Sequence, residues 1–121
     1  MMVLDASAVL AFLKGEPGEE AVERALERGA VAGAANWSEV AQKVIAAGED
    51  WNLARALLES YGVKVEPVSI VDAERAAARW GSDPHLSLGD RLCLALADRL
   101  DAEVLTADSA WGAEPPVRQI R

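Results

Sequence analysis

Short apolar segments alternate along this chain with longer segments in which apolar residues recur every three or four positions. The first pattern is typical of buried strands and the second of amphipathic helices. The predicted strands are Val3–Leu4 with the flanking Met2 and Asp5, Ala30–Ala35, Val63–Pro67, Glu103–Thr106 and Val117–Ile120. The predicted helices are Ala6–Leu13, Glu19–Arg28, Ser38–Ala47, Trp51–Tyr61, Val71–Trp80 and Leu88–Leu100. Strands that alternate with helices predict an α/β fold with a mostly parallel sheet.

The residues at the ends of these segments support the assignment. Ser7 is a suitable N-cap for the first helix. Gly29 and Gly48 follow helical segments, as glycine often does at a helix C-terminus. Leu88–Leu100 is nearly apolar on all sides, so we expect it to be a central helix.

Four acidic residues, Asp5, Glu39, Asp90 and Asp108, lie close to junctions between predicted elements. In a parallel α/β fold such junctions converge on one edge of the sheet, where ligands bind outside the carboxyl ends of the strands. Four carboxylates in one crevice repel one another and raise each other's pKa. Because hard divalent cations prefer oxygen ligands, this pattern predicts a site for Mg²⁺ or Mn²⁺. The chemistry that fits is hydrolysis of a phosphodiester by metal-activated water.

Each acid also has a structural interpretation. Asn36 and Glu39 have the spacing of a loose capping box, and Ser87 and Asp90 share it. Asp108 suits a turn or a helix cap. Only for Asp5 does the functional interpretation prevail on its own, since it ends a buried strand and an isolated buried carboxylate is costly.

Length and composition restrict the class of protein. The 121 residues fit one domain, and 51% of them are hydrophobic, which indicates a globular core. The single Cys93 forms no internal disulfide, which suits a reducing cytoplasm. We expect no signal peptide and no membrane span, because Asp5 interrupts the apolar N-terminus and no apolar run is long enough. The net charge of −8 argues against broad nonspecific nucleic-acid binding and suits a basic partner protein.

The chain resembles the PIN-domain nucleases, and most closely the VapC-type toxins of toxin–antitoxin pairs. The resemblance covers essentially the whole chain and is based on four motifs in order. These are Val3-Leu4-Asp5-Ala6-Ser7, Asn36-Trp37-Ser38-Glu39-Val40, LSLGDRLCLALA at residues 86–97, and Leu105-Thr106-Ala107-Asp108 followed by Trp111. It implies a single three-layer α/β/α domain over residues 1–121, with a mostly parallel sheet of four to five strands.

The resemblance also implies an activity and a set of site residues. Asp5, Glu39, Asp90 and Asp108 match the four acidic metal-site residues of the family, and Ser7 and Thr106 match polar residues that flank them. Relatives of this type are Mg²⁺- or Mn²⁺-dependent endoribonucleases. They form dimers and are held inactive by an antitoxin whose C-terminal segment covers the active groove.

The number of metal ions stays open, because Ser109 and Ala110 occupy places where many relatives carry a further acid. Two other functions also stay open. A non-catalytic scaffold or regulatory domain would keep the fold and suit the acidic charge. A phosphatase with Asp5 as nucleophile is less favoured, since no second aspartate follows closely.

Basic and aromatic residues provide candidates for RNA contact. Arg91, next to Asp90, is the favoured phosphate ligand. Lys14, Lys43, Arg75 and Arg79 are candidates for an RNA path, although a solvated helix face is the preferred interpretation for each. Among the tryptophans, Trp37 is the one expected to lie beside the site.

Overall fold

The fold is built on a five-stranded parallel sheet with the strand order β3-β2-β1-β4-β5. We describe it from a computed structural model that covers residues 1–121. All four strand pairings in the sheet are parallel. The strands are β1 (Met2–Leu4), β2 (Ala30–Gly33), β3 (Lys64–Glu66), β4 (Glu103–Thr106) and β5 (Val117–Gln119). The predicted parallel α/β architecture is therefore confirmed.

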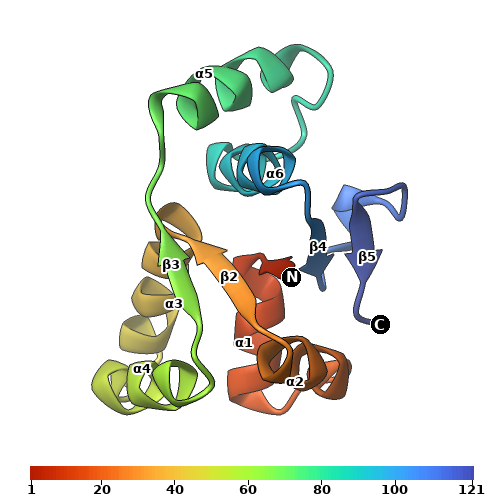
Figure 1. Ribbon diagram of the computed structural model, residues 1–121. Helices are drawn as coiled ribbons and strands as arrows, with labels where there is room; N and C mark the ends of the chain where they lie inside the picture. Colours follow the sequence, from red (N-terminus) through yellow and green to blue (C-terminus); the bar gives the residue numbers. More distant parts are fainter.

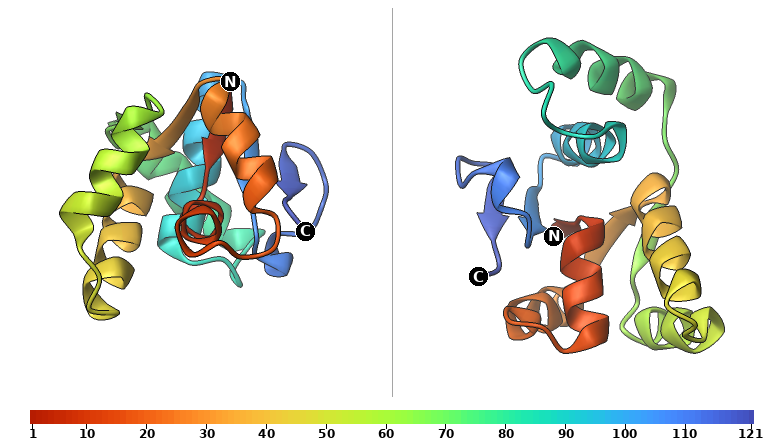
Figure 2. Two further views of the ribbon diagram at one scale, coloured as in Figure 1. Left: turned by 90° about the horizontal axis from the view of Figure 1, so that it is seen from below. Right: turned by 180° about the vertical axis from the view of Figure 1, so that it is seen from behind.

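Six α-helices surround the sheet and complete a three-layer arrangement (Figure 1). They are α1 (Ala6–Lys14), α2 (Glu19–Glu27), α3 (Ala34–Ala46), α4 (Trp51–Ser60), α5 (Ile70–Ala78) and α6 (Leu88–Leu100). Two short 3₁₀ helices follow α5 and β4, at Arg79–Gly81 and Ser109–Trp111. Figure 2 shows α1 and α2 on the side of the sheet opposite α6, with α5 outside α6. No helix is long and apolar enough to cross a membrane.

The core has one half on each face of the sheet, as expected from the alternation of side chains along a strand. Leu4 and Leu105 point to the face covered by α1–α4, where they pack with residues such as Val22, Val40 and Leu58. Their neighbours Val3 and Val104 point to the opposite face, where α6 contributes Cys93, Leu94, Leu96 and Ala97. The predicted central position of α6 is confirmed, because it packs between the sheet and α5.

The predicted N-cap of the first helix and the predicted start of the third were wrong. The first helix is capped by Asp5 rather than Ser7, because the Asp5 carboxylate accepts a hydrogen bond from the backbone N–H of Ala8. The third helix begins at Ala34, four residues before the predicted start at Ser38. Gly33 is its N-cap and provides no side-chain hydrogen bond, so the usual polar signal for a helix start is missing.

The strand order places a topological switch point between β1 and β4. From β1 the chain proceeds outward to β2 and β3, and it then returns to the other side of β1 to form β4 and β5. At such a point the connections leave neighbouring strands in opposite directions, which opens a crevice at the carboxyl ends. Asp5 directly follows β1 and Asp108 lies two residues beyond β4, so both acids lie at this crevice.

Candidate metal site at the carboxyl edge of the sheet

The four acids predicted from the sequence line one open cavity of about 350 Å³. Asp5 follows β1, Glu39 lies in the second turn of α3, Asp90 lies in the first turn of α6, and Asp108 follows β4. Four segments that are distant in sequence are thus brought to one place. The cavity is also lined by Ala6, Ser7, Leu10, Lys14, Glu16, Lys43, Ala107 and Arg121.

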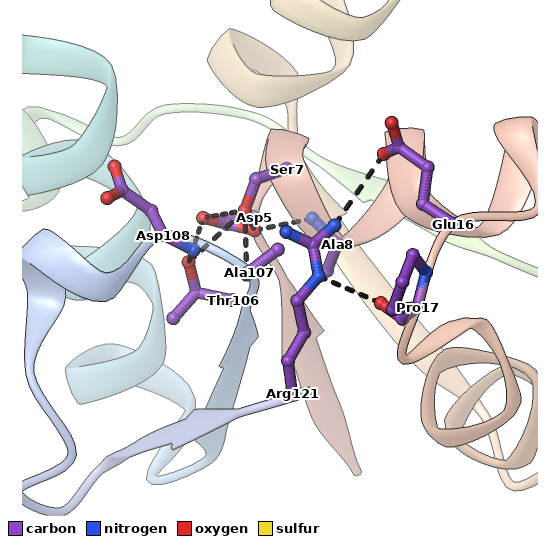
Figure 3. Close-up of polar contacts among 9 residues, drawn as sticks. All are labelled: Asp5, Ser7, Ala8, Glu16, Pro17, Thr106, Ala107, Asp108 and Arg121. Carbon is purple, nitrogen blue, oxygen red and sulfur yellow. Dashed lines mark hydrogen bonds and ion pairs between the residues drawn. The ribbon is translucent and has the colours of Figure 1, made fainter.

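Asp5 is the buried member of this group, with only 3% of its surface exposed. Oδ1 accepts hydrogen bonds from the backbone N–H of Ala8 and from Ser7 Oγ, both at 2.8 Å. Oδ2 accepts from Ser7 Oγ at 2.9 Å and from Thr106 Oγ1. Figure 3 shows these contacts, which come from the start of α1 and the end of β4. They hold the carboxylate in one orientation across the switch point.

Ser7 and Thr106 also connect the Asp5 carboxylate to the segment that carries Asp108. Ser7 Oγ accepts a hydrogen bond from the backbone N–H of Ala107 at 2.8 Å. Thr106 Oγ1 accepts one from the backbone N–H of Asp108 at 3.0 Å. The two hydroxyl groups therefore fix the distance between the ends of β1 and β4.

The environment of Asp5 raises its pKa from 3.8 to about 6. Burial is the largest cause, because it disfavours the charged form, and the nearby charge of Asp90 acts in the same direction. The hydrogen bonds from Thr106, Ala8 and Ser7 stabilise the carboxylate and limit the rise. A bound cation would stabilise the ionised form that burial penalises.

Glu39 is positioned by the buried side-chain amide of Asn36, a residue that the sequence pattern predicts to be a helix cap. Asn36 lies inside α3 and is 2% exposed, and its Nδ2 donates to Glu39 Oε1 at 2.8 Å and to the carbonyl of Gly89 at 3.2 Å. This amide joins α3 to the first turn of α6. A Cβ atom at Gly89 would lie 2.7 Å from Glu39 Oε1, so glycine at this position leaves room for the carboxylate.

Asp90 and Asp108 are helix caps that also line the cavity. The Ser87–Asp90 capping box is present, with Asp90 Oδ2 accepting from the backbone N–H of Ser87 at 3.1 Å. Asp108 Oδ1 accepts from the backbone N–H of Ala110 at 2.9 Å. Each cap occupies one carboxylate oxygen, and the second oxygen accepts no hydrogen bond from the protein. Because a carboxylate has two oxygens, capping and ligand binding are compatible at these residues.

The buried thiol of Cys93 is affected by the charges of three of the acids. Cys93 is fully buried in α6, and its pKa is raised well above the ordinary value. Burial is the main cause, and the charges of Asp5, Asp90 and Glu39 add to it. A thiol with this pKa remains protonated and unreactive near neutral pH, so Cys93 acts as a core residue.

The donor set suits Mg²⁺ or Mn²⁺, which prefer oxygen ligands. In this conformation, however, no three His, Cys, Asp or Glu side chains converge closely enough to hold an ion among them. This spacing fits a cation that keeps several waters and binds through one or two carboxylates, as Mg²⁺ commonly does. It does not resemble the preformed cage of a structural metal site.

Two residues singled out in the sequence have contacts away from the cavity. Arg91 Nη1 donates to the carbonyl of Ala76 at 2.7 Å and Nε donates to that of Leu86 at 3.4 Å, so its guanidinium joins α6 to α5. Trp37 packs edge-on against Trp51 with the ring centroids 5.3 Å apart. Arg121, which no local pattern distinguishes, lines the cavity because β5 returns the chain to this edge.

The model of the PIN domain family matches residues 2–113, which is nearly the whole chain. The chain belongs to the PIN domain family. Among its relatives, this PIN domain is 33% identical over 107 residues to ribonuclease VapC42 of Mycobacterium tuberculosis, covering 79% of this chain and 82% of the relative. The same values hold for VapC ribonuclease Mb2780c of Mycobacterium bovis.

Solved structures share the fold of this PIN domain at low sequence identity. A toxin–antitoxin complex from Klebsiella pneumoniae superposes with a TM-score of 0.79 at 21% identity and covers 100% of this chain and 98% of its own. VapC20 of Mycobacterium tuberculosis is described as a toxin that cleaves the sarcin–ricin loop. It superposes with a TM-score of 0.70 at 16% identity and covers 93% of this chain and 95% of its own. These likenesses establish the three-layer fold.

Proposed function

We propose that this PIN domain is a Mg²⁺- or Mn²⁺-dependent endoribonuclease that acts as the toxin of a toxin–antitoxin pair. In this proposal residues 1–121 form one nuclease domain, and RNA phosphodiester bonds are hydrolysed by water that a divalent cation activates. The proposal rests on the observation that four acids from four separate segments line one cavity. These are Asp5, Glu39, Asp90 and Asp108. The relatives named VapC ribonucleases support the choice of RNA as substrate.

The roles that we assign follow from the contacts of each residue. Asp5, Glu39, Asp90 and Asp108 supply the carboxylate oxygens that would hold a hydrated cation, one or two directly and the others through its waters. Ser7 and Thr106 orient Asp5, and Asn36 orients Glu39. The chemistry that a bound Mg²⁺ or Mn²⁺ supplies is activation of water and neutralisation of charge on the phosphate. Arg91 has no place in this scheme, since backbone carbonyls hold its guanidinium.

We propose that the cognate antitoxin binds an apolar cleft beside the acidic cavity. The cleft has a volume of about 900 Å³ and is lined by α1, α3 and α4, including Leu13, Val44, Leu53 and Leu57. Leu10 and Lys14 line both the cleft and the cavity, so the two adjoin. A peptide with an apolar face in the cleft and a basic side chain in the cavity fits both surfaces. Solved toxin–antitoxin complexes that share this fold support such a partner.

We also propose that the domain forms homodimers through the surface around α5. Six of the ten exposed large hydrophobic residues lie between Val65 and Leu88, and Ile70 and Trp80 are 80% and 62% exposed. Such a concentration of exposed apolar side chains is typical of a protein–protein interface.

Cleavage of total small RNA in the presence of Mn²⁺ or Mg²⁺ tests the proposed activity. The wild type is compared with Asp90→Asn, which removes a charge from the cavity and keeps an oxygen for the backbone N–H of Ser87. Asp98→Asn is the matched control, because Asp98 is an exposed acid on the same helix that lines no part of the cavity. We expect cleavage by the wild type and Asp98→Asn and none by Asp90→Asn. Undiminished cleavage by Asp90→Asn would refute the assignment.

A further inference from the structure

A nuclease with a net charge of −8 needs local positive charge to bind an RNA backbone. Several arginines of this chain already bind carbonyl or carboxylate groups of the protein itself. Arg91 is held by backbone carbonyls. The arginines in ion pairs are Arg55, Arg79, Arg99, Arg118 and Arg121. The remaining cations, which form no ion pair, are Lys14, Arg24, Arg28, Lys43, Lys64 and Arg75. Their positions decide where phosphates can bind.

Three cations line the cavity that holds the four acids: Lys14, Lys43 and Arg121. We refer to them as the basic rim. Lys14 is the last residue of α1 and Lys43 lies in the last turn of α3. Both side chains are exposed. These two lysines are the only unpaired cations of the chain that line the cavity.

Arg121 is the fixed member of the basic rim. Its Nε donates to the carbonyl of Pro17 at 2.9 Å, and its Nη2 lies 3.7 Å from Glu16 Oε1 (Figure 3). The preceding Ile120 donates its backbone N–H to the carbonyl of Thr106 at 3.0 Å and packs against Gly18. The guanidinium is therefore held at one side of the cavity, while the two lysines remain free to adapt.

We propose that the two lysines of the basic rim, Lys14 and Lys43, bind backbone phosphates of the RNA next to the bond that is cleaved. This inference rests on the proposed function and assigns to the rim the positioning of the substrate. The four acids alone would repel an RNA strand, and rim cations at the same cavity offset that repulsion. Lysine is a hydrated point charge on a flexible stem, so it binds phosphates without reading bases. The rim thus supplies affinity that is independent of sequence.

Lys43 also lies one helical turn after Glu39, which suggests a simpler role as a neutralising neighbour. The two roles differ in a measurable way. A lysine that only neutralises Glu39 changes the affinity for the cation, but it does not change the number of phosphates contacted. The dependence of RNA affinity on salt concentration reports that number, because each phosphate contact releases bound counterions.

The test uses fluorescence anisotropy with a labelled single-stranded RNA oligonucleotide of mixed sequence. All proteins carry Asp90→Asn to prevent cleavage, and Mn²⁺ is held constant while KCl is varied. The rim variant is Lys14→Gln/Lys43→Gln. The matched control is Arg24→Gln/Arg28→Gln, which lowers the net charge equally at two unpaired, exposed cations outside the cavity. Thermal melting establishes that both variants are folded.

We expect the rim variant to reduce the slope of log affinity against log salt by about 1.4, since each single-strand phosphate contact contributes about 0.7. The control variant should keep the slope of its parent. Equal slopes for the rim and control variants would overturn the inference even if the wild type cleaves RNA. A reduced slope in the rim variant, together with no RNA cleavage by the wild type, would uphold the rim and remove the proposed function instead.

Discussion

Asp5 has a structural role that requires it to be buried, and burial disfavours its charged form when no cation is bound. It caps α1 and joins the ends of β1 and β4, which requires an acceptor in a buried position. Burial in turn raises its pKa to about 6, so its charged form is disfavoured near neutral pH. The fold therefore holds a carboxylate that a divalent cation would stabilise. This cost is expected at a binding site, where local stability is given up for function.

The cost of ionising Asp5 should be visible in the pH dependence of stability without divalent cations. Between pH 3.8 and about 6 the native state holds a proton on Asp5 that the unfolded state has lost. The contribution of Asp5 to the free energy of unfolding therefore falls as pH rises through this window and stays constant above it. Relative to wild type, Asp5→Asn should gain about 3 kcal/mol between these limits. Urea unfolding of both proteins in a chelator measures this gain, and a constant difference across the window would contradict it.

At the scale of elements, α6 is joined to α5 by two arginines that point away from the cavity. Arg99 contacts the buried Asp72, with Nε 3.0 Å from Oδ1. Burial raises the pKa of Asp72, but the hydrogen bonds from Arg99 and Ser69 more than offset it and lower that pKa below its ordinary value. Arg91 donates to the carbonyl of Ala76, which is fully buried. These contacts fix the helix that carries Asp90.

Arg91→Ala should therefore weaken folding rather than RNA binding. It leaves the carbonyl of Ala76 without its charged donor, and a loss of about 2 kcal/mol is expected for hydrogen bonds of this kind. Urea unfolding measures the loss, and Arg24→Ala is the control, since Arg24 is exposed on α2 and its side chain forms no ion pair or hydrogen bond. An unchanged unfolding midpoint combined with weaker RNA binding would restore Arg91 as a phosphate ligand.

The sequence predicted the elements well where local signals were strong. The bounds of α6 and β4 match the predicted Leu88–Leu100 and Glu103–Thr106. The start of α3 could not be predicted, because the small residues Ala30–Ala35 continue from strand into helix and Gly33 provides no polar cap. The four acids could be placed at one edge of the sheet because parallel strands end there. The contacts of Arg91, Arg121 and Asn36 depend on tertiary packing that no local pattern reports.

At the scale of the whole molecule, an acidic cavity and an apolar cleft lie side by side. Leu10 and Lys14 belong to both. One surface attracts cations and basic side chains, and the other is suited to an apolar helix face. A single partner peptide that spans both would block the cavity directly. This arrangement provides a physical basis for inhibition of the proposed toxin by its antitoxin.

Leu53→Glu tests this arrangement, because Leu53 is 70% exposed and lines the cleft. A charge there should weaken binding of the antitoxin while RNA cleavage by the free protein remains. Ile45→Glu is the matched control, since Ile45 is 62% exposed on α3 and does not line the cleft. Isothermal titration with the antitoxin gives the affinities. Equal affinities for the two variants would place the antitoxin elsewhere.

We propose that the four acids act together as a site for a divalent cation. The most direct measurement is the melting temperature as a function of Mn²⁺ concentration for wild type, Asp90→Asn and Asp98→Asn. We predict a saturable rise for the wild type and Asp98→Asn, equivalent to about 2.7 kcal/mol at a hundred times the dissociation constant, and its loss in Asp90→Asn. A wild type that shows no saturable rise, or an Asp90→Asn variant that keeps it, would contradict a metal site at these acids and favour a non-catalytic scaffold.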